Sequence, residues 1–364
     1  MVAELKTGIK YDHAFIASKK DPLIVLNNFL QAGIFTKYVM YEGKDEVRIA
    51  GGELATVLVT PERVLLAGMG KTISEPVSNP LKQLEKLLDS LQLKDWTAYG
   101  YVGFDLVRFY SAYSKAISQP LCQFLIPETE LHFNREGVKI KTTKSIELVK
   151  QILSDDTQLP NYEPTSLKVD RSQQSDYQQS VSTLIEAIKE EHLHKAIISR
   201  SFKLDGALDI LGTYKLAAQA NNSARSYCLD LGDVRAVGFS PETLIEVNET
   251  GFVTTNPLAG TRHRGVNAEE DLQLHNELFT DAKEVKEHSL SIWLAQSEIA
   301  SVCLPETVHI YNFMEVKKYR CVQHLSSRVG GQLKPDHSFW DALIVLFPGI
   351  GENIGFVRPG ATSY

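Results

Sequence analysis

The sequence predicts an α+β protein in which antiparallel hairpins and helices follow one another irregularly. Residues 36–68 alternate apolar and polar positions between glycine and proline turn markers, a pattern typical of antiparallel strands. Helical periodicity occurs in separate segments, without the regular β-α-β alternation of a doubly wound parallel sheet. The 364 residues suffice for one large domain or two ordinary ones, so length alone does not set the domain count.

The first half of the chain contains one clear helix and one unusual strand. Asn79-Pro80 opens the helix, because proline is tolerated in a first helical turn. Its leucines fall on one face: Leu81, Leu84, Leu87, Leu88 and Leu91. The glycine-rich, aromatic stretch Tyr99–Asp105 predicts a strand against which another backbone packs closely. Polar residues 155–175 then form the best candidate linker.

The second half alternates helices with short strands. Helices are expected at about 176–192, 207–220, 281–302 and 337–347, where apolar residues recur with helical spacing. Strands are expected at Lys195–Arg200, 307–314 and 317–332, and Asn248–Gly251 predicts a hairpin turn.

Composition argues against several functional classes. The formal net charge of −7 gives no general attraction to nucleic acid or to an anionic membrane. The four cysteines lie far apart and predict neither a zinc site nor a disulfide framework. The first residues lack the apolar run of a signal peptide, and no segment is long and apolar enough to span a bilayer. We therefore expect a cytoplasmic protein; the sequence leaves its oligomeric state open.

Two carboxylates on the long helix are candidate metal ligands. Glu284 and Glu287 are three residues apart, so both side chains project from one helix face. Such a pair suits Mg²⁺, which prefers oxygen ligands and often takes further ligands from water or substrate. The alternative is a solvated acidic face interleaved with Lys283 and Lys286.

Two further residues are candidates for proton transfer. Glu242 lies between apolar strands, where a partly buried carboxyl group can act as a general acid. Lys195 opens an apolar strand, and a lysine in a low-dielectric cleft can serve as a base. The alternatives are a turn residue that caps backbone amides for Glu242 and a surface lysine at a strand end for Lys195.

One glycine turn and one histidine complete the candidates. In Pro257–Arg262, the backbone amides around Gly260 could meet an anion, although the segment could equally be an ordinary loop. His324 lies on an apolar strand, where a histidine is commonly a hydrogen-bonded core residue.

Five segments, in this order, resemble the chorismate-utilising enzymes and most of all their salicylate synthases. They are Lys195–Arg200, Gly238–Glu242, Pro257–Arg262, Asp281–His288 and Val322–Leu325. The resemblance implies one chorismate-binding domain over 1–364, with an anthranilate synthase component I-like fold of two packed antiparallel sheets and outer helices. It is strong over about 175–350 and less specific over about 1–155.

The resemblance also implies a reaction. Chorismate would bind with its ring carboxylate on Mg²⁺, held by Glu284 and Glu287. Lys195 would activate water for attack at ring carbon C2, and Glu242 would protonate the departing C4 hydroxyl. Ala259, Gly260, Thr261 and His324 would contact the substrate. Isochorismate would form first, and loss of pyruvate would yield salicylate for siderophore or other secondary-metabolite biosynthesis.

Two positions choose among the family's activities. Ammonia-using anthranilate synthases place no lysine at the Lys195 position, and aminodeoxychorismate synthases carry a lysine nucleophile where this chain has Ala259. The pair therefore favours water as the nucleophile. Isochorismate synthases share it, and they remain the alternative.

The tail at 351–364 departs from the family pattern. After Ile350 the sequence shows no counterpart of the family's carboxylate-binding loop or of its second pair of metal-binding carboxylates. On this basis the chain is expected to be C-terminally truncated, with doubtful activity as printed. A further hypothesis is then a catalytically inactive family member that acts as a binding protein.

Overall fold

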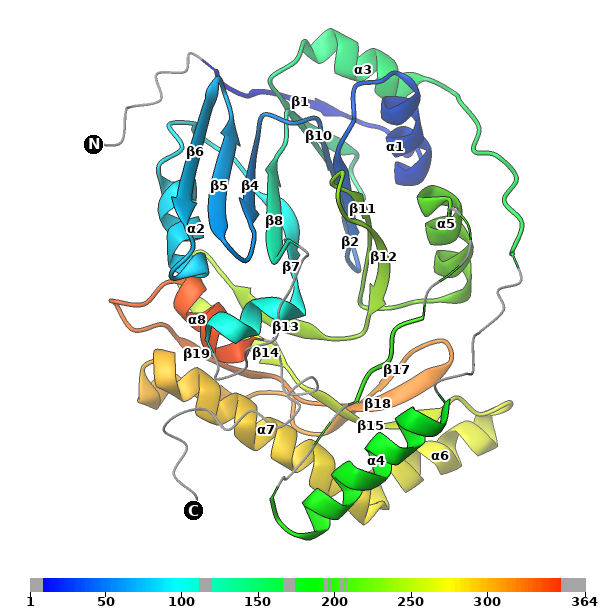
Figure 1. The fold of residues 1–364 in the computed structure, drawn as a ribbon. Helices are drawn as coiled ribbons and strands as arrows, with labels where there is room; N and C mark the ends of the chain where they lie inside the picture. The colour runs from blue at the N-terminus through cyan, green and yellow to red at the C-terminus, as the bar shows by residue number, and fades with distance from the viewer. Residues whose placement is uncertain are drawn as a thin grey trace. The chain divides into compact units, whose positions relative to one another are not determined.

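The computed structural model describes residues 9–110, 120–165, 174–192, 196, 198–202, 204, 206 and 208–347 (Figure 1). The chain forms two compact units. Unit 1 comprises Met1–Phe109, Ser114–Glu163 and Leu208–Pro241, and unit 2 comprises Tyr110–Tyr113, Pro164–Ala207 and Glu242–Tyr364. A boundary thus falls at Glu163–Pro164, inside the predicted linker.

Unit 1 contains a seven-stranded antiparallel sheet that joins distant parts of the chain. Its strands, in spatial order, are β1 (Asp12–Ile16), β10 (Val138–Thr142), β9 (Thr129–Phe133), β3 (Val47–Gly51), β2 (Tyr38–Glu42), β11 (Arg225–Asp230) and β12 (Arg235–Ser240). The β2–β11 pairing, with Tyr38 opposite Asp230, brings the segment after the linker back into the first unit.

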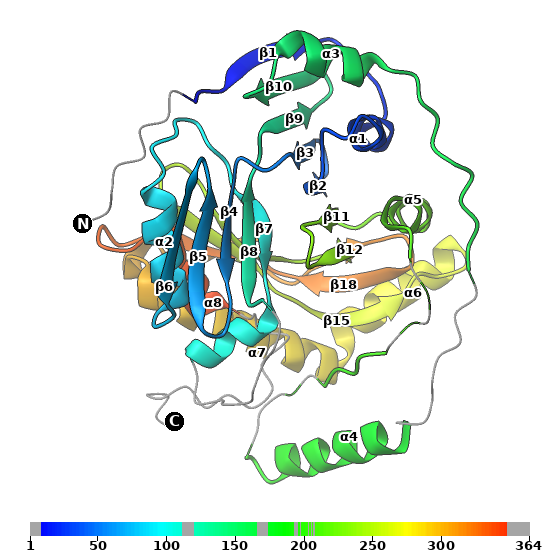
Figure 2. The same cartoon turned by 45° about the horizontal axis from the view of Figure 1, so that its top comes forward.

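Three helices bury apolar faces against this sheet. They are α1 (Pro22–Gln31), α3 (Ile146–Ser154) and α5 (Ile210–Ala220) (Figures 1 and 2). Each begins at a side chain that accepts a hydrogen bond from the first turn: Asp21, Ser145 and Asp209. Phe29 and Leu26 of α1 are fully buried in the resulting core.

A second sheet of unit 1 contains five strands. They are β6 (Lys71–Pro76), β5 (Arg63–Gly68), β4 (Ala55–Val59), β8 (Cys122–Ile126) and β7 (Tyr99–Val102), with α2 (Pro80–Asp89) nearby in sequence. A Cβ atom at Gly100 would collide with the carbonyl group of Gln123. The predicted close backbone approach at Tyr99–Asp105 is therefore confirmed, and the 3-10 helix η1 (Phe104–Phe109) follows it.

Unit 2 is built on two smaller antiparallel sheets. The first orders β13 (Thr243–Val247), β14 (Phe252–Asn256), β19 (Val329–Gln332) and β16 (His309–Ile310). The second orders β15 (Leu258–His263), β18 (Val322–Ser326) and β17 (Glu315–Lys318). Its helices are α4 (Gln174–Lys189), α6 (Ala268–Thr280), α7 (Ala282–Val302) and α8 (Phe339–Leu346), with the 3-10 helix η2 (Pro305–Thr307).

The single long strand expected at 317–332 is wrong in two respects. The chain turns at 319–321, between β17 and its antiparallel partner β18. The expected strand also divides at Ser327 into β18 and β19, which belong to different sheets. The backbone amide of Ser327 donates to the carbonyl of Pro257, where β14 likewise gives way to β15. Proline has no amide hydrogen to continue a ladder, so both strands change sheet at the same level.

Other expectations have mixed outcomes. The α+β class, the antiparallel sheets, the hairpin at Asn248–Gly251 and the long helix are confirmed. In the described part of the chain the strands form four sheets, two in each unit, where two sheets were expected. The described residues 196 and 198–200 form no strand, because no neighbouring strand pairs with them; Lys195 and Ile197 lie outside the described residues.

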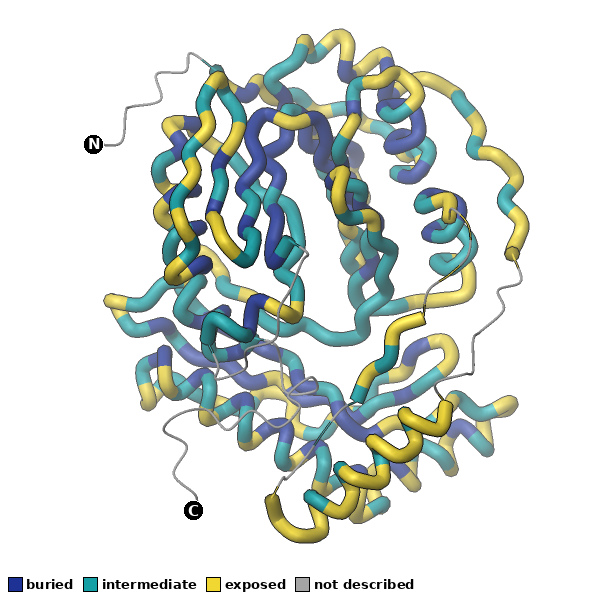
Figure 3. Tube along the Cα trace, in the orientation of Figure 1, coloured by how far each residue is buried: buried dark blue, intermediate teal, exposed yellow. Residues whose placement is uncertain are grey.

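Burial differs strongly between the helices. Figure 3 shows α4 exposed along its length, and none of its residues is buried. By contrast, Ile292, Ala295 and Ile299 of α7 join Val253 and Val329 in the core of unit 2. None of the helices described is both long and apolar enough to cross a membrane.

Candidate active site

A glycine bulge on β15 is the structural centre of the candidate site. In the β15–β18 pairing Ala259 lies opposite Leu325 and Thr261 lies opposite His324, so Gly260 is the extra residue. Its φ of +82° is in the left-handed region, which glycine adopts without a steric penalty. A bulge of this kind bends the strand and re-aims the next side chain, here Thr261.

Thr261 and His324 contact each other across the two strands. Thr261 Oγ1 lies 2.9 Å from His324 Nδ1, and the histidine tautomer decides which atom donates. Burial lowers the pKa of His324 below its ordinary value, and a hydrogen bond with the Gly260 backbone partly opposes this. Burial thus favours the neutral form of His324, and the predicted substrate contacts Gly260, Thr261 and His324 lie together. Ala259, the fourth, is buried beside them on β15.

Helix α7 places Glu284 against this bulge. The Asp281 side chain caps the helix by accepting from the backbone amides of Lys283 and Glu284. Glu284 is buried, and its Oε1 atom accepts a hydrogen bond of 2.9 Å from Arg262 Nη1. Arg262 Nη2 also donates to Asp281 Oδ2 at 2.8 Å, so this arginine fastens β15 to the first turn of α7.

The second carboxylate, Glu287, is one helical turn further on and is paired with a lysine. Lys283 Nζ lies 2.8 Å from Glu287 Oε2 and 3.4 Å from Glu284 Oε1. The hydrogen bond with Glu287 is the main cause that raises the pKa of Lys283 above its ordinary value. The solvated acidic face that the sequence offered as an alternative is therefore only partly present, because Glu284 is buried while Lys283 is exposed.

The chemistry of these donors fits a hard divalent cation. Among the described residues no group of three or more His, Cys, Asp and Glu side chains forms a metal cluster, so Glu284 and Glu287 supply only two protein ligands. A Cβ atom at position 260 would lie 3.2 Å from Glu284 Oε2, so the glycine leaves space beside that oxygen. Mg²⁺ commonly takes one or two carboxylates and completes its shell with water and substrate oxygens.

Glu242 is connected to the same strand. It directly precedes β13, and its Oε1 atom accepts a hydrogen bond of 3.2 Å from the backbone amide of Leu258. Burial, followed by the negative charge of Glu242, raises the pKa of Tyr319. The Tyr319 ring lies 5.7 Å from the His324 ring, centroid to centroid, so this tyrosine stands near both candidates.

Two residues near the site were not assigned roles from the sequence. Tyr319 lies in the turn before β18, and no spacing rule singles it out. His288 is fully buried, and its Nε2 atom lies 2.8 Å from Ser327 Oγ. Because His288 is four residues after Glu284, this contact holds the Glu284 face of α7 toward the sheet. In the sequence, the four-residue spacing of Glu284 and His288 was the signal that could have identified His288.

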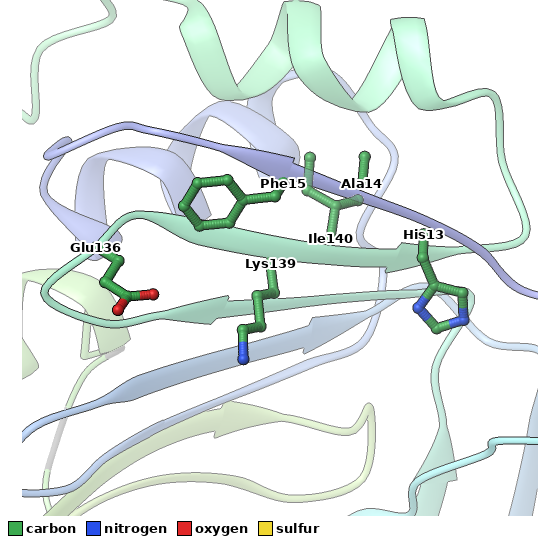
Figure 4. A pocket seen from close by; sticks show the side chains of 6 residues that line it. All are labelled: His13, Ala14, Phe15, Glu136, Lys139 and Ile140. Atoms are coloured by element: carbon green, nitrogen blue, oxygen red, sulfur yellow. The ribbon is translucent and has the colours of Figure 1, made fainter.

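Lys195, the predicted base, lies outside the described residues. By contrast, Figure 4 shows a pocket in unit 1, on β1 and the β9–β10 hairpin. It is lined by His13, Ala14, Phe15, Glu136, Lys139 and Ile140. It contains none of the predicted site residues.

Comparison with known proteins identifies the family to which this sequence is similar. Residues 36–350 match the sequence profile of the family described as chorismate binding enzyme. The salicylate synthase of Mycolicibacterium paratuberculosis is 31% identical over 319 residues, which cover 86% of this chain and 70% of that protein.

Solved structures share the fold. Anthranilate synthase component I from Streptococcus pneumoniae superposes with a TM-score of 0.71 at 23% identity, over 83% of this chain and 72% of that one. The menaquinone-specific isochorismate synthase from Escherichia coli gives 0.62 at 14% identity, over 94% and 76%. At these identities the likeness concerns the fold, and three different activities are represented.

Proposed function

The chain belongs to the family of chorismate binding enzymes, and we propose that it converts chorismate to salicylate and pyruvate with water as the nucleophile. The observation that carries the proposal is the convergence on β15 of a carboxyl group, a bulge with a hydroxyl–imidazole pair, and a helix that bears two carboxylates. Leu258 contacts Glu242, Thr261 contacts His324, and Arg262 contacts Glu284.

The proposed first step exchanges the position of a hydroxyl group. Lys195 takes a proton from water as the water oxygen bonds to ring carbon C2. The ring double bonds shift, the C4–oxygen bond breaks, and Glu242 gives its proton to the departing hydroxyl, which leaves as water. The product is isochorismate, and the assignment of Lys195 rests on the sequence resemblance alone. A positioned acid and base each typically contribute a factor of about 10²–10⁴.

The second step eliminates pyruvate. The bond between ring carbon C3 and the enolpyruvyl oxygen breaks, the hydrogen on C2 passes to the enolpyruvyl methylene carbon, and the ring becomes aromatic. The C2 oxygen that came from water remains as the salicylate hydroxyl. Neutral His324 and Thr261 provide hydrogen-bonding groups for the substrate next to Gly260, whose missing side chain lets the ring approach the backbone.

The remaining residues would position the metal ion that binds a carboxylate of the substrate. Glu284 and Glu287 would hold Mg²⁺, which would supply positive charge to a substrate carboxylate. Arg262 fixes the orientation of Glu284 through its own ion pair at 2.9 Å. Asp281 shares that arginine and caps α7, so the carboxylate geometry is set by the helix start.

The test is product analysis with chorismate and Mg²⁺, followed by salicylate fluorescence and pyruvate release. The printed chain is assayed beside a version that is continued after Ile350 with the C-terminal segment of a salicylate synthase. Lys195→Gln should lower turnover by a factor of about 10²–10⁴. Lys189→Gln, an exposed lysine of α4 paired with Glu186, is the matched control and should retain full turnover. A near-normal rate for Lys195→Gln would show that another group is the base.

An isochorismate synthase is the alternative, because the pairing of Lys195 with Ala259 is common to both activities. Chorismate that disappears without release of pyruvate would establish this alternative. Chorismate binding without any turnover, in both versions of the chain, would instead support a binding protein.

A further inference from the structure

We propose that Lys283 is a displaceable counter-ion, which holds Glu284 and Glu287 together without a metal and leaves them when a divalent cation binds. The inference rests on the proposed function, because it assumes that these carboxylates bind the cation. Its specific content is that one side chain of the chain itself competes for the site and sets its affinity.

Two basic side chains that contact these carboxylates, Arg262 and Lys283, differ in how firmly they are held. Arg262 is 21% exposed and donates to both Glu284 and Asp281, at 2.9 and 2.8 Å. Lys283 is 71% exposed and reaches Glu284 Oε1 at only 3.4 Å, while its shorter contact of 2.8 Å is with Glu287. Removing the lysine from the carboxylates therefore breaks weak, solvent-exposed contacts, whereas removing the arginine would detach β15 from α7.

The position of Lys283 in the helix supports a local role for its charge. It lies in the first turn of α7, directly after the Asp281 cap, where the helix dipole is positive and disfavours a cation. Helix stability therefore does not account for a lysine at this position. Its ammonium group is stabilised there by the two carboxylates, whose charges need compensation because Glu284 is only 11% exposed.

A divalent cation would compensate the negative charges of Glu284 and Glu287 more effectively than Lys283 does. One ion at the carboxylates provides twice the charge of the ammonium group and has no side-chain entropy to lose. The space left by Gly260 lies beside Glu284 Oε2, whereas Arg262 binds the other oxygen, Oε1. Arg262 can thus stay in place while Lys283 turns toward solvent.

The experiment is Mn²⁺ binding to the full chain without substrate, measured by electron paramagnetic resonance and by calorimetry. Lys283→Met should tighten binding by about two- to tenfold, since an exposed ion pair competes only weakly. Lys283→Arg keeps the charge and should bind like the unmodified chain. Lys286→Met is the matched control: it removes a positive charge from the same helix, and among the described residues it forms no ion pair with Glu284 or Glu287.

The outcomes separate this inference from the proposed function. If Glu287→Gln weakens Mn²⁺ binding but Lys283→Met leaves it unchanged, the metal site stands and the counter-ion role is overturned. Equal gains from Lys283→Met and Lys286→Met would also overturn it, because a general charge effect would explain both. If no variant binds Mn²⁺, or if Glu284→Gln and Glu287→Gln have no effect, the assumed metal site itself is wrong.

Discussion

The two units use buried polar side chains differently. In unit 1, Glu130 and Lys141 lie directly opposite each other on β9 and β10, and their charged atoms are 2.8 Å apart. That pair follows the register of one sheet. In unit 2, Arg262 joins a strand to a helix, and its partners are a candidate ligand and the helix cap. The Glu130–Lys141 pair therefore supports a sheet, whereas Arg262 fixes the position of Glu284, a candidate metal ligand.

The hydrophobic cores of the two units also differ. The core of unit 1 combines a seven-stranded sheet with three capped helices, although the first 155 residues carry few recognisable motifs. The core of unit 2 is formed mainly by α7, α8 and the strands β14 and β19, next to polar contacts such as His288 with Ser327. A region with few recognisable motifs can thus still form an extensive hydrophobic core.

The largest expected effect is on turnover in unit 2. Glu242→Gln removes the proposed acid and should lower turnover by a factor of about 10²–10⁴ without weakening Mn²⁺ binding. Glu246→Gln, four residues further along on β13 and 45% exposed beside Arg328, should leave turnover unchanged. Steady-state kinetics in the continued version of the chain measures both. Equal losses of turnover in Glu242→Gln and Glu246→Gln would show that Glu242 has no special role as the acid.

A core truncation in unit 1 should give the largest loss of stability. Phe29→Ala removes a fully buried ring and should lower the free energy of unfolding by about 3–5 kcal/mol, as measured by chemical denaturation. The control Phe15→Ala, at a side chain that is 51% exposed, should change it by less than about 0.5 kcal/mol. Mn²⁺ affinity of the folded Phe29→Ala protein should be unchanged, and a large drop would show that the two units are not functionally separate.

Two glycines with similar backbone conformations provide a direct comparison. Gly33, at φ +66°, has nothing within 4 Å of an added Cβ atom, so Gly33→Ala should cost only the backbone penalty of about 1 kcal/mol. Gly260→Ala adds contacts of 3.2–3.3 Å with Glu284 and should cost about 2–3 kcal/mol in unfolding free energy. Only Gly260→Ala should also weaken Mn²⁺ binding. Equal effects would mean that the space beside Glu284 has no role.

Acid should weaken unit 2 through Asp271. Hydrogen bonds from Arg264 and then Lys318 hold the pKa of Asp271 well below its usual range. Its contribution to stability is therefore present above the unfolded-state pKa of about 3.9 and is lost as the pH falls toward the folded-state value. Asp271→Asn should destabilise the protein most at pH 6 and progressively less as the pH falls below about 4, whereas exposed Asp45→Asn in unit 1 should change little across this range. A pH-independent difference for Asp271→Asn would contradict this.

The smallest expected effect is at a surface ion pair of unit 1. Arg135 and Asp45 are 2.6 Å apart, but their side chains are 86% and 57% exposed. Arg135→Gln should therefore change the free energy of unfolding by about 0–1 kcal/mol. Arg262→Gln should cost more, because it leaves buried Glu284 without its arginine partner. Thermal denaturation of Arg135→Gln and Arg262→Gln would show whether losing the partner of a buried carboxylate costs more stability than losing an exposed ion pair.

The sequence predicted local features well and long-range contacts poorly. The spacing of Glu284 and Glu287 predicted a shared helix face, and α7 begins within one residue of the expected start. The β2–β11 pairing was not predictable, because Tyr38 and Asp230 are distant in the chain and alternation alone does not specify a partner strand.

Site details that depend on side chains from several elements were also missed. Arg262 on β15 contacts Glu284 and Asp281 at the start of α7, and the sequence gives no signal that these two elements meet. Tyr319 approaches His324 because a turn before β18 returns the chain, and the sequence gives no signal for that ring contact. The role of Lys195 remains a prediction, as does the single-domain organisation over 1–364.

The most direct test of the central claim is chorismate conversion in H₂¹⁸O with Mg²⁺ and ammonium both present. Attack of water at C2 predicts salicylate with one ¹⁸O atom in its hydroxyl group, and no anthranilate. Mass spectrometry of the products measures this in one experiment. Anthranilate as the product, or salicylate that carries no label, would contradict water as the nucleophile at this site.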